Sequence, residues 1–117
     1  MRCTCLPPGT LDVLHVIEAP GWMEGHAAAL PGIEQARRGT ALRLDVVHDQ
    51  MTRSGIAASV RELTGTPSEQ INRVARESGV DLVVLGARGR TNHLYGLVGS
   101  TAERVIKDGP CPVLAVP

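Results

Sequence analysis

Asp81-Leu-Val-Val-Leu-Gly-Ala-Arg-Gly-Arg90 is the stretch of sequence that decides the fold of this chain. Its four apolar residues after the aspartate predict a strand buried on both faces, which is typical of parallel sheets. The strand ends at Gly86, and open parallel sheets bind their ligands beyond the carboxyl ends of strands. Glycines allow backbone N–H groups to approach an anion closely, so the turn after this strand is suited to phosphate.

A second glycine turn, Gly99-Ser100-Thr101, precedes a helix expected over residues 100–107. Ala102, Val105 and Ile106 lie on one side of this helix and are expected to be its buried face. The N-terminus of a helix offers free N–H groups and the positive end of the helix dipole. The two turns together predict a phosphate site, although each glycine taken alone could be only a turn residue.

Strands and helices alternate along the rest of the chain. Apolar runs predict strands, and apolar residues at steps of three and four predict helices. The expected strands cover residues 11–17, 56–62, 81–85 and 111–117, and the expected helices cover residues 33–51, 67–78 and 100–107. This order predicts one α/β domain over residues 1–117, with a parallel sheet that carries helices on its faces. The strand over residues 56–62 alternates loosely and is expected near a sheet edge.

The helix that begins after Thr66 has the clearest boundaries. Thr66 is a suitable N-cap, Pro67 suits the first helical position, and Glu69 is spaced to reach back to the cap in a capping box. Gly79 is placed to end the helix in the left-handed conformation.

Composition excludes several classes of partner. The chain has 12 basic and 12 acidic residues, so no net charge attracts it to nucleic acid or to a membrane. No apolar run approaches the roughly 18 residues of a membrane span, and Trp22 and Tyr95 are too few aromatics to stack bases. Cys3, Cys5 and Cys111 lack the spacing of a zinc site. We expect a cytoplasmic protein with no metal site of its own.

The glycine spacing, Gly86-x2-Gly89-x9-Gly99-Ser100, resembles that of the universal stress protein family. The sequence Gly-Pro-Cys-Pro-Val-Leu-Ala-Val at residues 109–116 adds to the likeness, as do Leu14-His-Val16 and Gly65-Thr-Pro67. The resemblance covers residues from about 10 to 117 and is weak between 19 and 55. It implies a flavodoxin-like (adenine nucleotide alpha hydrolase-like) parallel sheet with helices on both faces, often in a dimer.

The resemblance also implies a nucleotide, because family members with this glycine spacing bind ATP. Carried over by position, three groups of residues would hold it, with Mg²⁺ accompanying the phosphates. Gly86, Ala87, Arg88, Gly89 and Arg90 would wrap the ribose and phosphates, Gly99, Ser100 and Thr101 would donate to the phosphates, and Val16 would pack near the adenine.

A nucleotide-responsive regulatory module of the stress response is therefore the expected function, with ATP as a signal. We expect no enzyme, because His93, Glu103 and Ser100 show no oriented catalytic pair, although slow hydrolysis of ATP is conceivable. A homodimer is expected through the last strand, where Val113–Val116 would form an apolar edge. The alternative is a structural interaction domain of the same fold that binds no nucleotide and acts through dimerisation.

One departure from the family is large. Family members open with an aspartate-bearing strand and a helix, and this chain has neither before its strand over residues 11–17. In the family's strand order, 3-2-1-4-5, the missing strand is central, so the truncated sheet has four strands and a gap of about 9.6 Å. Residues 2–6 could fill it as an antiparallel hairpin strand, since too few residues remain for a parallel crossover. Direct pairing of the flanking strands, a strand from a partner chain, and a start codon assigned too late are the other possibilities.

Overall fold

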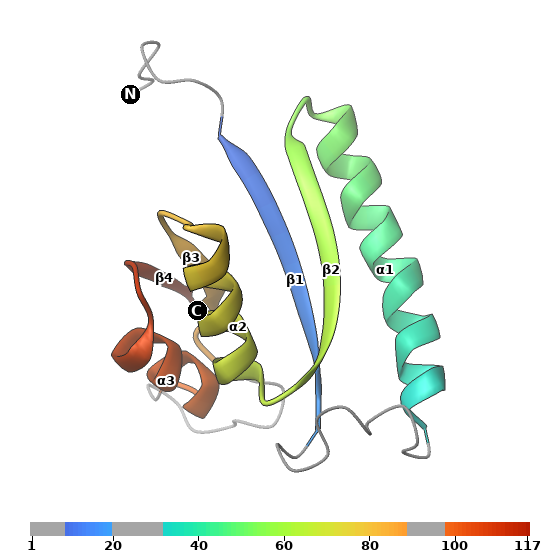
Figure 1. Cartoon of the computed structure of the whole chain (residues 1–117). Coiled ribbons are helices and arrows are strands. Elements are labelled where there is room, and N and C mark those ends of the chain that lie inside the picture. The colour runs from blue at the N-terminus through green and yellow to red at the C-terminus, as the bar shows by residue number, and fades with distance from the viewer. Residues whose placement is uncertain (1–8, 20–31, 89–97) are drawn as a thin grey trace.

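The computed structural model of this chain describes residues 9–19, 32–88 and 98–117 (Figure 1). The elements are β1 (Thr10–Glu18), α1 (Ile33–Arg53), β2 (Ala57–Gly65), α2 (Pro67–Ser78), β3 (Val83–Gly86), α3 (Ser100–Asp108) and β4 (Val113–Val116). All four predicted strands and three predicted helices are present, so the α/β prediction is confirmed. No helix in the described ranges has the length and apolar character needed to cross a membrane.

The strands form two separate parallel pairs. β1 pairs with β2 from Thr10↔Ala57 onward, and β3 pairs with β4 from Val83↔Val113 onward. Within the described residues, no ladder joins one pair to the other. The gap expected in the centre of the sheet is thus confirmed, and direct pairing of the flanking strands is wrong. The proposed hairpin of residues 2–6 lies outside the described residues.

Helices α1 and α2 cover opposite faces of the β1–β2 pair. Arg37 on α1 donates to the Thr64 hydroxyl at 3.5 Å, whereas Arg61 donates to the hydroxyl of Ser78 on α2 at 3.0 Å. Residues 61 and 64 are three apart on one strand, so their side chains point to opposite faces. Helix α2 also packs against β1 and α3, and α3 packs against β4 (Figure 1).

The buried core of the described residues is small and lies mainly between α2 and α3. Its apolar members are Ile17, Ala19, Val74, Ala75, Ala102 and Val105. The expectation that Ile106 shares the buried face of its helix is wrong, because its side chain is 50 % exposed. Ala102 and Val105 are three residues apart and lie on the buried side of α3, and the further turn of about 100° carries Ile106 away from that side.

The sequence predicted both ends of α2, but the capping box that it predicted between Thr66 and Glu69 does not form. Pro67 is the first helical residue, and Gly79 ends the helix in the left-handed conformation with φ 61°. Thr66 is extended, with no side-chain hydrogen bond at the cap. Glu69 lines a surface cavity between α2 and α3 instead. The first turn of α2 therefore forms without the two capping-box hydrogen bonds that the sequence predicted between Thr66 and Glu69.

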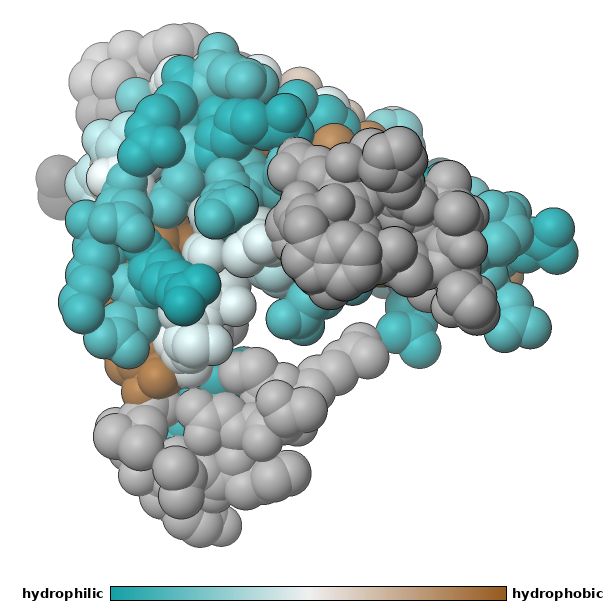
Figure 2. Space-filling model, turned by 60° about the horizontal axis from the view of Figure 1, so that its bottom comes forward, coloured by the Kyte–Doolittle hydropathy of each residue, from teal (hydrophilic) through white to brown (hydrophobic). Residues whose placement is uncertain are grey.

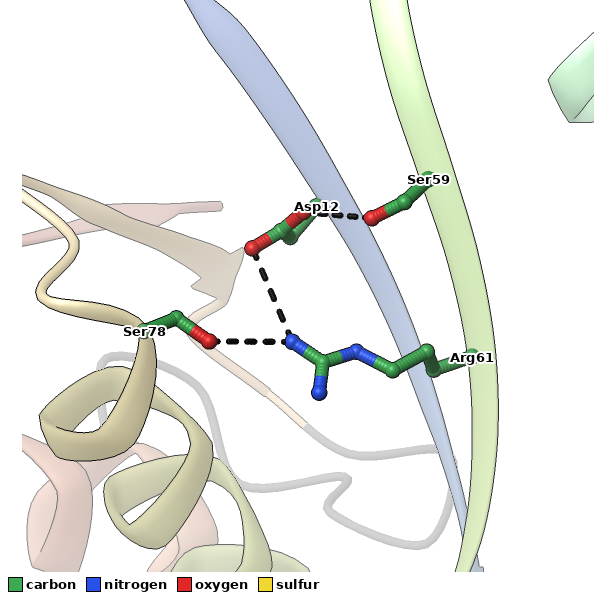
Figure 3. Close-up of polar contacts among 4 residues, drawn as sticks. All are labelled: Asp12, Ser59, Arg61 and Ser78. Atoms are coloured by element: carbon green, nitrogen blue, oxygen red, sulfur yellow. Dashed lines mark hydrogen bonds and ion pairs between the residues drawn. The ribbon is translucent and has the colours of Figure 1, made fainter.

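A polar cluster joins β1, β2 and the end of α2 (Figure 3). Ser59 donates to Oδ1 of Asp12 at 2.5 Å, and Nη2 of Arg61 lies 3.7 Å from Oδ2 of the same carboxylate. The same guanidinium nitrogen donates to the Ser78 hydroxyl. These contacts fix the C-terminal end of α2 against the β1–β2 pair, near the amino ends of the strands.

Candidate functional site

The first glycine turn begins where β3 ends. Gly86 is the last residue of the strand, and the N–H of Ala87 donates to the carbonyl of Val116 at 2.8 Å, so the turn is held by the end of β4. Arg88 follows and is exposed. The parallel strands therefore bring Gly86, Ala87 and the exposed Arg88 to the carboxyl end of the β3–β4 pair.

The second glycine turn is in direct contact with the first. Gly99 donates its N–H to the carbonyl of Ala87 at 2.6 Å, and it is buried as the N-cap of α3. A bond of this length holds the strand end and the helix start close together. The structure thus brings together Gly86, Ala87 and Arg88 with Gly99, Ser100 and Thr101.

The start of α3 presents backbone N–H groups that have no acceptor within the helix itself. The first bond within the helix runs from Glu103 N to Gly99 O at 2.9 Å, and the cap has no side-chain hydrogen bond. Ser100, Thr101 and Ala102 therefore have N–H groups with no carbonyl of their own helix to receive them. Ser100 is exposed and Thr101 is half-buried, so both hydroxyls lie at the same end. Such a helix start binds anions through its N–H groups and its dipole.

Val16 lies apart from these turns. It is half-buried on β1, opposite Leu63, and belongs to the other strand pair. No described backbone hydrogen bond links its strand to β3. Gly89 and Arg90 lie outside the described residues, as does His93, so their predicted roles stay predictions.

The acidic side chain nearest the start of α3 forms an ion pair with a lysine one helical turn later. Glu103 accepts a hydrogen bond from Lys107 at 2.9 Å, and the two charges attract. The bond lowers the pKa of Glu103 below its ordinary value and raises the pKa of Lys107 above its own. The carboxylate is thus held by an ammonium group, which reduces its repulsion of an anion at the N-terminus of α3.

The described surface that Figure 2 shows is mostly hydrophilic. The view brings the bottom of Figure 1 forward, and apolar residues show among the described residues only as small patches.

A cavity of about 350 Å³ lies between α2 and α3, away from the glycine turns. It is lined by Ser68, Glu69, Asn72, Arg76, Arg104 and Asp108. The sequence did not predict this cavity, because the polarity of Ser68 and Asn72 gives no sign that each is only 5 % exposed. The signal that the sequence offered was the spacing of Ser68 and Asn72, which puts two polar side chains on one side of the helix near its start.

A sequence model of the Universal stress protein family matches residues 6–117. Universal stress protein G of Escherichia coli O157:H7 is 32 % identical over 113 residues, which span 92 % of this chain and 78 % of the relative. Universal stress protein MJ0531 of Methanocaldococcus jannaschii is 42 % identical over 62 residues, 53 % of this chain. The matched segments span about a third of MJ0531 and of its relative MJ0577, 36 % and 33 % of their lengths.

Solved structures have the same fold. The structure of the hypothetical protein MJ0577 superimposes with a TM-score of 0.72 at 27 % identity, over 95 % of this chain and 77 % of that one. A universal stress protein family member from Burkholderia pseudomallei gives a TM-score of 0.63 at 29 % identity, over 92 % of this chain and 74 % of that one. Each of these neighbours is longer than the part that matches, by about a quarter of its own length.

Proposed function

This chain belongs to the universal stress protein family, and from that membership we propose that it binds ATP at the two glycine turns and works as a nucleotide-responsive module in the stress response. The observation that carries the proposal is the 2.6 Å bond between Gly99 N and Ala87 O. This bond joins the turn after β3 to the N-cap of α3, and the backbone N–H groups of both glycine turns are suited to binding phosphate.

The phosphates would lie over the start of α3. The N–H groups of Ser100, Thr101 and Ala102 have no helical acceptor, and the positive end of the helix dipole adds to their attraction for an anion. Arg88 is exposed on the neighbouring turn and supplies a full positive charge. Val16 would contact the adenine from β1.

Mg²⁺ fits this donor set as an ion carried by the nucleotide. The Ser100 and Thr101 hydroxyls are oxygen ligands of the hard type that Mg²⁺ prefers, and Mg²⁺ commonly keeps water and phosphate oxygens as its other ligands. In the described residues no three acidic, histidine or cysteine side chains gather as an independent metal site. When bound, the ion would neutralise phosphate charge.

We propose a binding protein and not an enzyme. Glu103, the acidic residue nearest the helix start, is held by Lys107 at 2.9 Å, and its lowered pKa makes it a weak base. Ser100 would need a neighbouring base to act as a nucleophile. The hydroxyls and N–H groups are therefore assigned to holding the phosphates.

Isothermal titration with ATP and Mg²⁺ tests the proposal, with a variant that separates binding from folding. Ser100→Glu places a negative charge where the phosphates would lie, while an acidic residue in a first turn stabilises the helix. We expect binding at least 10-fold weaker than in the unsubstituted chain and an unchanged or higher melting temperature. Ser54→Glu, at the exposed end of α1, is the matched control and should leave ATP binding unaltered.

A second function is favoured by the break in the sheet. β1, which carries Val16, and β3, which leads into the glycine turns, belong to separate strand pairs. A chain with this arrangement could serve as an interaction domain of the same fold that acts through dimer contacts. Absence of heat with ATP at sub-millimolar protein, together with a stable dimer in sedimentation, would favour that function.

A further inference from the structure

The groove between α2 and α3 holds a cavity that the glycine turns do not use. The two helices lie side by side in Figure 1 and pack against each other. The cavity has a volume of about 350 Å³, and its lining residues all come from these two helices. Its six lining side chains are polar or charged: Ser68, Glu69, Asn72, Arg76, Arg104 and Asp108. This volume is near the lower end of the range for small-molecule sites, so a ligand here would be small and polar.

Asn72 is the most buried charge-bearing or amide side chain of this lining together with Ser68, and its amide is unsatisfied. The residue is only 5 % exposed, and its Oδ1 is buried without a hydrogen-bond partner among the described residues. The oxygen lies beside Gly109, 3.1 Å from the position that a Cβ there would take. A half-turn about the Cβ–Cγ bond exchanges the oxygen and the nitrogen, so the amide can offer the cavity either an acceptor or a donor. Buried groups of this kind are normally hydrogen-bonded, and a polar molecule in the cavity would supply the partner.

The walls of the cavity carry charges of both signs. Helix α2 contributes Glu69 and Arg76, and α3 contributes Arg104 and Asp108, all four exposed. None of these side chains forms an ion pair with another described residue. One hydrogen bond crosses the groove, from Nη2 of Arg76 to the backbone carbonyl of Asp108 at 2.5 Å. Two guanidinium groups and two carboxylates therefore surround the cavity, with no net charge between them.

This balance of charge selects the class of ligand. A simple anion attracted by Arg76 and Arg104 would also meet two carboxylates, and a simple cation attracted by the carboxylates would meet two guanidinium groups. A molecule with one charge of each sign can place its carboxylate against a guanidinium group and its ammonium group against a carboxylate. Charge-assisted hydrogen bonds then form at both of its ends.

We propose that the cavity between α2 and α3 binds a small zwitterion, a molecule whose carboxylate and ammonium group are joined by a short aliphatic chain. Arg76 and Arg104 would bind the carboxylate, Glu69 and Asp108 would bind the ammonium group, and the amide of Asn72 would bind the end that lies deeper. The site is separate from the proposed nucleotide site, because its residues on α3 lie in the second half of that helix and the nucleotide site is at its start.

An NMR titration of the chain without nucleotide tests this inference, so its failure is separate from failure of ATP binding. The probes are glycine, β-alanine, γ-aminobutyrate and ε-aminocaproate, which carry the same two charges on chains of increasing length, at constant ionic strength. Butyrate and butylamine are the matched compounds with one charge each. One member of the series should shift the side-chain amide signals of Asn72 saturably and bind about 10-fold or more tightly than either single-charge compound.

Variants of exposed residues test the wall charges without disturbing the core. Glu69→Gln and Arg104→Gln each remove one of these charges, and each should weaken binding of the best zwitterion by about 5-fold or more. Glu77→Gln on α2 and Arg43→Gln on α1 are the matched controls, because they remove exposed charges of the same two kinds outside the lining. The controls should change the affinity by less than about 2-fold. Equal weakening in a variant and its control would overturn the proposal.

Other results of the titration would also overturn it. Binding of butyrate as tight as that of the zwitterion would make the cavity an anion site, and equally tight binding of butylamine would make it a cation site. If no compound of the series shifts the amide signals of Asn72, the cavity holds no ligand of this class.

Discussion

The side chain of Gln70 fills the space beside Gly65. Its Nε2 lies 2.8 Å from the position that a Cβ on residue 65 would take, and Gly65 is buried with φ 149°. The close approach occurs where β2 turns into α2, and Gln70 itself is only 3 % exposed. Glycine is therefore required at this turn for both conformation and space.

Gly65→Ala should lower the free energy of unfolding by about 1–3 kcal/mol, because the new methyl group meets Gln70 and the backbone conformation is unfavourable. Gly39→Ala is the matched control, since a Cβ there meets nothing within 4 Å inside α1. It should raise stability by about 0.5–1 kcal/mol. Urea unfolding followed by circular dichroism measures both, and equal effects of the two changes would contradict this account.

Removal of the Arg61 guanidinium should release the end of α2 from the strands. Asp12 and Arg61 are 33 % and 43 % exposed, so screening limits their attraction, and Arg61→Met should cost about 0.5–1 kcal/mol. A double-mutant cycle with Ser78→Ala should show coupling of a few tenths of a kcal/mol or more. Arg53→Met, which breaks an exposed pair within α1, should have a smaller effect.

The pair of Glu103 and Lys107 predicts a specific dependence on pH. The pKa of Glu103 is lowered, so its stabilising contribution is complete above the ordinary value of 4.5 and is lost as pH falls through the lowered value. The pKa of Lys107 is raised above 10.5, so its contribution is lost as pH rises through that raised value. In Lys107→Gln, an NMR titration should find the pKa of Glu103 higher than in the unsubstituted chain. An identical titration curve would show that the bond is absent in solution.

The free edge of β4 predicts a homodimer. Val83 donates to Pro112 and Ala87 to Val116, so even-numbered residues of β4 bond to β3 and the N–H of Ala115 points to the free edge. Ala115→Pro removes that donor without breaking the ladder to β3. Sedimentation should show a dimer for the unsubstituted chain and a monomer for the variant, with similar melting curves at low concentration. A monomer in both cases would exclude this interface.

Local signals in the sequence predicted the elements well. Pro67 and Gly79 define the ends of α2 because each restricts or permits a particular backbone conformation. Apolar runs located β3 and β4, but the expectation that the strand before Gly86 is buried on both faces is wrong, because Val84 is 58 % exposed on one face of β3. The break in the sheet was also expected, because the family resemblance indicated an absent central strand.

Contacts between distant elements were not predictable in this way. The burial of Ser68, Gln70 and Asn72 depends on how α2 meets the rest of the fold, and local polarity indicates exposure. The link from Arg61 to Ser78 joins residues 17 apart and depends on the crossing of β2 and α2. In the candidate site, the glycine spacing gave the residues, but only the fold shows that Gly99 bonds to Ala87.

The interrupted ladder also affects the cooperativity of unfolding. A continuous sheet transmits stability from strand to strand. Here, within the described residues, the two strand pairs are linked through helices, because α2 packs against β1, β2 and α3, and α3 packs against β4. Two units of different stability are the expected result, one containing α1 with β1 and β2, the other containing α3 with β3 and β4. The thermal transition of this chain should accordingly be broader than that of a single cooperative domain of its size.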